Sequence, residues 1–118
     1  MKTAADLINE AKGRITETTA DEVRERRARG DAFTLLDVRE PNEWAMGHIE
    51  GAVHIPRGVM ESAIEARVPR DQEVVIYCAS GNRSALAADV LQQMGYRTVS
   101  SMRGGIRGWA DAGGEVAH

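Results

Sequence analysis

The sequence predicts an α/β protein whose mostly parallel sheet is covered by helices on both faces. Short apolar segments rich in β-branched residues alternate with helical segments along the chain, the pattern of consecutive βα units. The clearest strand, residues 74–77, is apolar without interruption, as expected when helices cover both faces of a parallel sheet. Functional sites in such sheets form beyond the carboxyl ends of the strands.

The N-terminal half contains two predicted helices and two predicted strands. Helical periodicity predicts a short helix over residues 4–12 that ends at Gly13. Thr19 and Glu22 fit a capping box, so a second helix is expected over residues 20–29, closing at Gly30. Two apolar segments predict buried strands, which are residues 33–38 and residues 52–55, the latter ended by Pro56.

The C-terminal half continues the alternation of helix and strand. The expected elements are a helix over 59–67 that stops before Pro69, the strand over 74–77, a strong helix over 83–94 with Gly95 after it, a strand over 96–100 and a helix over 106–112. The segments that leave strands toward the expected site are residues 37–40 and the stretch that begins at Cys78.

Length and composition favour one domain, residues 1–118, with residues 1–13 as an N-terminal helical extension. The 118 residues are 42% hydrophobic and 28% charged, which is typical of a globular protein. A formal net charge of −3 provides no basic footprint for nucleic acid and no polybasic patch for a membrane surface. Without a signal peptide or an apolar run of ~20 residues, a cytoplasmic location is expected.

The single cysteine, Cys78, excludes an internal disulfide and a zinc site built from several cysteines. It begins a loop of small and polar residues between the clearest strand and the strongest helix. Such a loop can turn its N–H groups inward, and together with a helix N-terminus it favours a thiolate. Arg83 adds a planar cationic group suited to an oxyanion. The alternative without a function is that Cys78 is a small buried hydrophobic residue. The candidate site consists of Cys78 with Ala79, Ser80, Gly81, Asn82, Arg83 and Ser84.

Several further motifs, in order and in register, resemble the rhodanese homology domain family. They are Asp37-Val38-Arg39-Glu40, Glu43-Trp44, the run from Gly47 to Pro56, and Gly104-Gly105-Ile106-Arg107-Gly108-Trp109. The similarity extends from about residue 18 to residue 116, and one departure is Gly113-Gly114-Glu115-Val116, where many members carry a proline before the valine. The resemblance implies a three-layer rhodanese-like sandwich with a central five-stranded parallel sheet, its first strand lying near residues 15–16, and a Cys78 that takes up sulfur as a persulfide.

The length of the cysteine loop separates two chemistries within this resemblance. Sulfurtransferase members have a six-residue loop that begins at the cysteine, and Cys78 to Arg83 is six residues. Related phosphatases and arsenate reductases use a loop with five residues between cysteine and arginine, whereas this chain has four. The resemblance therefore favours sulfur transfer over phosphate chemistry.

Other polar and aromatic residues near the motifs have structural alternatives. Asp37 is interpreted as half of a structural ion pair, while Arg39 is either a substrate-binding residue or a framework residue held by Glu43 or Glu40. Structural roles are also expected for four rings, those of His48, His54, Trp44 and Trp109. The Ser80 and Ser84 hydroxyls are interpreted as hydrogen-bond donors to bound sulfur or to the helix start.

The resemblance implies a thiosulfate sulfurtransferase that needs no metal and no organic cofactor. Its expected partners are thiosulfate as donor and cyanide or a thiol as acceptor, with nucleic acid and membrane excluded. Because no second cysteine can receive the sulfur internally, the acceptor must come from outside. The alternative is a persulfide carrier that relays sulfur between partner proteins, which needs the same loop. A catalytically dead regulatory domain is disfavoured because Cys78 is present.

Overall fold

A five-stranded, all-parallel sheet forms the centre of the molecule, with the strand order β1-β5-β4-β2-β3. The computed structural model describes all 118 residues. The strands are β1 (Thr16–Thr18), β2 (Thr34–Asp37), β3 (Val53–His54), β4 (Val74–Tyr77) and β5 (Val99–Met102). The predicted fold class is confirmed, including the short first strand, which pairs with β5 at one edge of the sheet.

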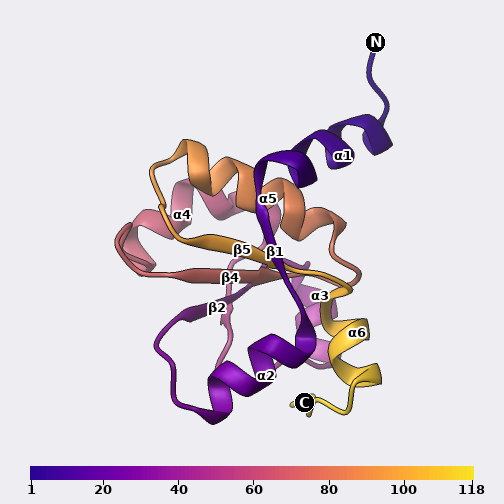
Figure 1. Cartoon of the computed structure of the whole chain (residues 1–118), viewed down its shortest axis with the longest axis vertical. Coiled ribbons are helices and arrows are strands. Elements are labelled where there is room, and N and C mark those ends of the chain that lie inside the picture. Colours follow the sequence, from indigo (N-terminus) through magenta and orange to yellow (C-terminus); the bar gives the residue numbers. More distant parts are fainter.

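Helices cover the two faces of this sheet (Figure 1). The helices are α1 (Ala4–Arg14), α2 (Ala20–Ala28), α3 (Pro41–Met46), α4 (Met60–Arg67), α5 (Asn82–Gln93) and α6 (Gly105–Asp111), with a 3₁₀ turn, η1 (Arg57–Val59), before α4. Helices α1, α4 and α5 lie on one side of the sheet, and α2 and α6 lie on the other (Figure 1). No helix combines the length and the apolar character needed to cross a membrane.

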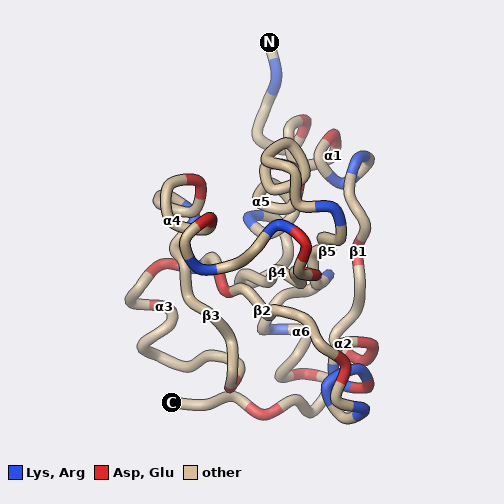
Figure 2. Tube along the Cα trace, turned by 90° about the vertical axis from the view of Figure 1, so that its left-hand side faces the viewer, with Lys and Arg blue, Asp and Glu red and all other residues tan.

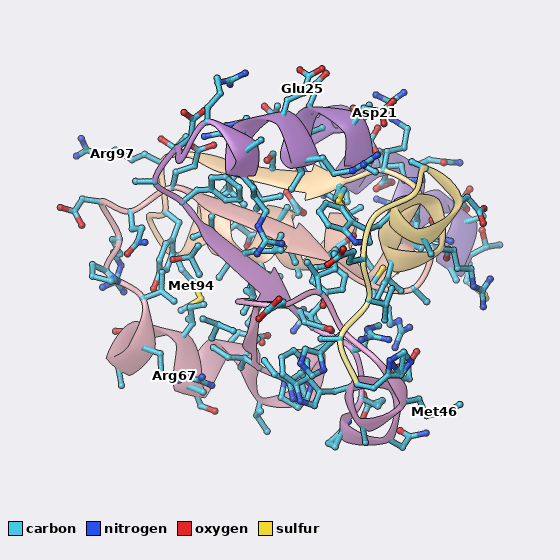
Figure 3. The ribbon with its side chains drawn as sticks, turned by 90° about the horizontal axis from the view of Figure 1, so that it is seen from below. Asp21, Glu25, Met46, Arg67, Met94 and Arg97 are labelled. Atoms are coloured by element: carbon cyan, nitrogen blue, oxygen red, sulfur yellow. The ribbon has the colours of Figure 1, made fainter.

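Alternation along the central strands builds a separate hydrophobic core under each helical layer. On β4, Val74 and Ile76 join the larger cluster beneath α4 and α5, whereas Val75 and Tyr77 join the cluster beneath α2 and α6. All four are fully buried, which explains why the strand is apolar on both faces. The strands β4 and β5 carry no charged residue (Figure 2), and the only charged residue of β2 is the buried Asp37 at its end. Helix α2 carries both signs, and its Asp21 and Glu25 point away from the sheet in Figure 3.

The first helix is anchored to α5 rather than left as a free extension. Arg14 makes two hydrogen bonds of 3.0 and 2.7 Å to the Asp89 carboxylate on α5, and Lys12 donates to Asn82 at 3.3 Å. The prediction that this helix ends at Gly13 is wrong, because Gly13 does not take a left-handed conformation and the helix continues through Arg14. It ends where Ile15 becomes extended and leads into β1.

The last strand begins later than the sequence predicts. The predicted strand includes residues 96–98, but the observed strand runs from Val99 to Met102. Gly95 is left-handed, and the Tyr96 amide turns back to donate to the Leu91 carbonyl at the end of α5. The Tyr96 hydroxyl then donates to the Val68 carbonyl at 2.6 Å, so this residue closes the helix instead of entering the sheet.

Helix α3 is not predicted from the sequence, although its start carries a clear signal. Pro41 occupies the first turn, and the Glu43 side chain accepts a hydrogen bond of 2.9 Å from the Glu40 amide. The helix has only six residues and no buried residue, so hydrophobic periodicity could not reveal it. It lies beyond the carboxyl end of β2, close to the expected site (Figure 1).

Helix α6 docks directly on the backbone that follows β4. The Ile106 amide donates to the Cys78 carbonyl at 2.9 Å, and the Arg107 amide donates to the Ala79 carbonyl at 3.2 Å. This close approach requires Gly105, whose φ is +58° and where a Cβ atom would lie 2.5 Å from the Ala79 carbonyl oxygen. The start of α6 therefore fixes the position of the cysteine loop.

Two glycines in α6 provide a matched test of this contact. We expect Gly105→Ala to lower the free energy of unfolding by more than about 1 kcal/mol, because the left-handed backbone and the clash both disfavour a side chain. Gly108→Ala, whose Cβ would meet its nearest neighbour at an ordinary 3.7 Å, should be neutral or stabilise by up to about 1 kcal/mol. Urea unfolding of both variants measures the contrast, and equal effects would contradict it.

Candidate functional site

The Cys78 side chain lies at the carboxyl end of β4, where the chain turns into α5. The residue is only 1% exposed, and its loop closes at Gly81, which has a φ of +105°. A Cβ at Gly81 would come within 3.2 Å of the Gly104 nitrogen, so this glycine allows the loop to pack against the start of α6. The loop is therefore held between the N-terminus of α5 and the N-terminus of α6.

Three groups surround the Cys78 sulfur with hydrogen-bonding capacity. The Gly81 amide donates to Sγ at 3.1 Å and the Ser84 amide donates at 3.4 Å. The Ser84 hydroxyl lies 3.5 Å from the same sulfur. All three belong to the last part of the loop and the first turn of α5, so the inward-facing amides expected from the loop composition have a definite geometry.

Burial and hydrogen bonding act on the thiol in opposite directions. Burial raises the pKa of Cys78, but hydrogen bonds from the Ser84 hydroxyl and from the amides of Ser84, Gly81 and Ser80 lower it more, so the pKa of Cys78 falls below its ordinary value. The net effect favours a thiolate, which is the nucleophilic form of cysteine.

The remaining predicted loop residues have different surroundings. The Ala79 carbonyl receives the amide of Arg107, which ties the loop to α6. Ser80 and Asn82 are exposed, and the Asn82 side chain accepts from Lys12 on α1. Of the two serines predicted to be hydroxyl donors, the structure places Ser84, and not Ser80, beside the sulfur.

Arg83 lies in the loop, but its guanidinium is engaged by a carboxylate. Its two terminal nitrogens donate to the two oxygens of Glu43 at 2.6 and 2.9 Å. This hydrogen bonding raises the pKa of Arg83 and lowers the pKa of Glu43 to about 2, so both groups are charged across the physiological range. Sequence reasoning considered Glu43 only as a partner of Arg39, and its place beside Arg83 was missed.

Arg39 forms a buried framework contact at the end of β2. Its guanidinium donates to both oxygens of the fully buried Asp37 carboxylate, at 2.8 to 3.1 Å, and to the Gly47 carbonyl at 2.7 Å. The expectation that Glu43 or Glu40 supplies its carboxylate partner is wrong, because Asp37 does so. Arg39 is 5% exposed and is not among the groups that contact the Cys78 sulfur.

Two histidines and a tryptophan form a stack beside α3. The Trp44 ring lies 3.6 Å from the His48 ring and 4.8 Å from the His54 ring, nearly parallel to both. His48 bonds to the Trp44 carbonyl and His54 bonds to the Arg39 carbonyl. Trp109 packs in the core beneath α2 and α6. These contacts connect loops, as the structural interpretation of these four rings anticipates.

A buried residue of β5 also belongs to the site. The Ser101 hydroxyl lies 2.8 Å from the Ser84 hydroxyl, and both serines are 0% exposed. Sequence reasoning did not single out Ser101. The signal that could have found it was a serine in a strand buried on both faces, because a buried hydroxyl needs a hydrogen-bond partner.

A surface pocket lies away from the cysteine loop. It has a volume of about 480 Å³ and is lined by residues of α2, α6 and the C-terminal segment, and Cys78 is not part of it. No group of three or more His, Cys, Asp or Glu side chains is placed to hold a metal ion. The candidate site is therefore the cysteine loop itself, with its nearly covered sulfur.

Comparisons with known proteins agree with this architecture. Residues 19–112 match the rhodanese-like domain family. The chain is 37% identical over 99 residues to a sulfurtransferase of Allochromatium vinosum, covering 84% of this chain and 92% of that protein. It is also 37% identical over 108 residues to the probable adenylyltransferase/sulfurtransferase MoeZ of Mycobacterium tuberculosis, covering 91% of this chain but only 27% of that longer protein.

A solved structure extends the similarity over almost the whole chain. It is a protein of unknown function from Rhodopseudomonas palustris, RPA3614, described as a possible tyrosine phosphatase. The TM-score is 0.91 at 32% identity, with 99% of this chain and 96% of that chain covered. The helix α1 that precedes the family match therefore has a counterpart in a related structure.

The pair of Glu43 and Arg83 predicts a dependence of stability on pH. The depressed pKa of Glu43 means that the pair stabilises fully above the ordinary carboxyl value of 4.5 and loses its effect as pH falls through about 2. Since both side chains are partly exposed, we expect about 1 kcal/mol or less. The difference in unfolding free energy between the wild type and Glu43→Gln should shrink over that range.

Urea unfolding at several pH values measures this difference. The glutamine of the Glu43→Gln variant keeps an oxygen that can accept from the Glu40 amide, so the cap of α3 is retained. Glu25→Gln, a change on the exposed face of α2, controls for the loss of one negative charge. A difference that stays constant from neutral pH to a pH of about 2 would show that the ion pair contributes nothing.

Proposed function

The chain belongs to the rhodanese-like domain family, and we propose that it is a sulfurtransferase that carries sulfur as a persulfide on Cys78. The observation that carries the proposal is the sulfur of Cys78 facing the amides of Gly81 and Ser84 and the Ser84 hydroxyl. These donors stabilise negative charge on sulfur without a metal or a second cysteine.

With thiosulfate as donor, the reaction is a double displacement. The Cys78 thiolate attacks the sulfane sulfur, a new S–S bond forms, and sulfite leaves with the electron pair of the broken S–S bond. The outer sulfur now bears the negative charge. A nucleophilic acceptor, either cyanide or a thiolate, then attacks that outer sulfur, and Cys78 departs as a thiolate. No redox cofactor is needed, because the sulfane sulfur is passed on between nucleophiles.

Phosphate ester hydrolysis is a weaker candidate for this site. The loop has four residues between Cys78 and Arg83, one fewer than the phosphatase pattern. In addition, the Arg83 guanidinium gives both terminal nitrogens to Glu43, so a phosphate would have to compete with a carboxylate that stays ionised. Both observations support sulfur chemistry, although the similar Rhodopseudomonas protein is described as a possible phosphatase.

The same ion pair favours a second candidate, a persulfide carrier that exchanges sulfur with partner proteins. Thiosulfate is a dianion, and Glu43 offsets the charge of the one arginine in the loop. A donor whose sulfur arrives on a protein persulfide needs no oxyanion site at Arg83. The two candidates share the loop and differ in turnover: an enzyme processes a small donor repeatedly, and a carrier loads once.

Persulfide formation can be measured directly by intact mass. Reduced protein incubated with thiosulfate should gain one sulfur atom, and cyanide should remove it with release of thiocyanate. Cys78→Ser should gain none. Repeated turnover with thiosulfate and cyanide supports the enzyme, whereas a single loading that then stalls supports the carrier. If Cys78 gains no sulfur from thiosulfate and none from a low-molecular-weight persulfide, the proposal of sulfur transfer is contradicted.

Removal of the Glu43 charge should change the preference for donors. We expect Glu43→Gln to speed loading from thiosulfate by roughly 3- to 10-fold, because Arg83 regains an uncompensated charge near the dianion. Loading from an uncharged alkyl persulfide should change less. Intact-mass measurements on samples quenched at successive times give the loading rates for the two donors, with Glu25→Gln as the control for net charge. An equal change for both donors would show that Glu43 acts through the fold and not through charge.

A further inference from the structure

A chain of two buried hydroxyls leads from the Cys78 sulfur into the sheet. The Ser84 hydroxyl lies 3.5 Å from Sγ and 2.8 Å from the Ser101 hydroxyl. Ser84 is on the first turn of α5, and Ser101 is on β5, which pairs with β4. Both residues are 0% exposed, so water does not complete their hydrogen bonding. The second hydroxyl has no side-chain partner other than Ser84.

The number of protons decides the direction of this chain. With Cys78 as a thiol, three protons, one each on Cys78, Ser84 and Ser101, compete for the two gaps between these atoms, so one donor has no acceptor. With Cys78 as a thiolate, two protons fill the two gaps. Ser101 then donates to Ser84, and Ser84 donates to Sγ. Because an unpaired donor in a buried site is unfavourable, the arrangement is satisfied only with negative charge on the sulfur.

We propose that Ser101 is a positioning residue that directs the proton of the Ser84 hydroxyl toward the Cys78 sulfur. It does not touch the sulfur and acts only through Ser84. If Ser101 instead accepted from Ser84, its own proton would point into the closed core without an acceptor. Ser101 thereby keeps Ser84 oriented as a donor and polarises its O–H group.

The catalytic meaning of this inference rests on the proposed sulfur transfer. Sγ carries the negative charge twice in that reaction, first as the attacking thiolate and later as the group that leaves when the acceptor takes the outer sulfur. The Ser101–Ser84 chain stabilises Sγ in both states. The amides of Gly81 and Ser84 are fixed by the backbone, whereas a hydroxyl can rotate away, so the hydroxyl is the donor that needs a second residue to hold it.

The charged groups around Cys78 are independent of this chain. They are Arg83 with its partner Glu43, the buried pair of Asp37 and Arg39 at the end of β2, Arg103 and Arg107 on either side of the start of α6, and Lys12 of α1, which reaches the loop through Asn82. None of them forms a hydrogen bond with the Ser101 hydroxyl. Substitution of Ser101 therefore leaves the local charges in place, and a change in Cys78 titration reports the hydroxyl chain.

The test is the pH dependence of Cys78 alkylation by iodoacetamide in a double-mutant cycle. Since Cys78 is the only cysteine, the rate reports its thiolate fraction. We expect Ser84→Ala to raise the pKa of Cys78 by about 1 unit and Ser101→Ala to raise it by about half a unit. In the Ser84→Ala background, Ser101→Ala should add nothing. An unchanged pKa in Ser101→Ala, or an equal shift in both backgrounds, would overturn the proposal.

Two sets of controls separate the hydroxyl from its packing. Ser101→Thr and Ser101→Val have nearly the same shape, and only threonine should keep the wild-type pKa, whatever the two changes do to stability. Ser100→Ala, the neighbouring position on β5, should leave the pKa unchanged. Valine and threonine with the same pKa would overturn the proposal. The titration uses no sulfur donor, so its outcome is separate from that of the persulfide experiment.

Discussion

The structure depends on one requirement, which is to hold negative charge on a sulfur atom that solvent barely reaches. Cys78 is 1% exposed, and burial alone would keep it neutral. The response is a loop whose amides converge on Sγ, and that loop is possible only because two glycines admit close backbone contacts. Gly81 lets the loop pass the start of α6, and Gly105 lets α6 bond to the carbonyls of Cys78 and Ala79.

A second set of contacts connects the cysteine loop to α3. The buried Asp37 carboxylate holds Arg39, and Arg39 in turn donates to the Gly47 carbonyl at the end of α3. Breaking such a buried pair leaves an uncompensated charge, which typically costs about 3 to 5 kcal/mol. The helix it positions presents Glu43 to Arg83. The buried pair of Asp37 and Arg39 does not hydrogen-bond to the sulfur, but it positions the Glu43 carboxylate that neutralises Arg83 of the cysteine loop.

Sequence reasoning reached the features that local chemistry determines. The strand β4, the helix α5 and the cysteine loop between them follow from an uninterrupted apolar run, from helical periodicity and from small residues after a cysteine. It missed features that depend on contacts distant in sequence. The strand β5 starts at Val99 and not at Tyr96, because Tyr96 bonds to Leu91 and Val68. Ser84 and Ser101 meet only because β5 lies beside β4.

The arrangement of charges also bears on what the site can accept. Arg39 is paired with Asp37 and Arg83 is paired with Glu43, so neither arginine brings a net positive charge to the sulfur. The groups that act on the sulfur directly are the loop amides and the Ser84 hydroxyl, whose directed field acts over one or two atoms. Such a field stabilises a donor whose negative charge lies on a small atom at that position. The rest of the donor molecule has little effect on this stabilisation. A site of this kind suits a single terminal sulfur, whether a small molecule or a protein delivers it.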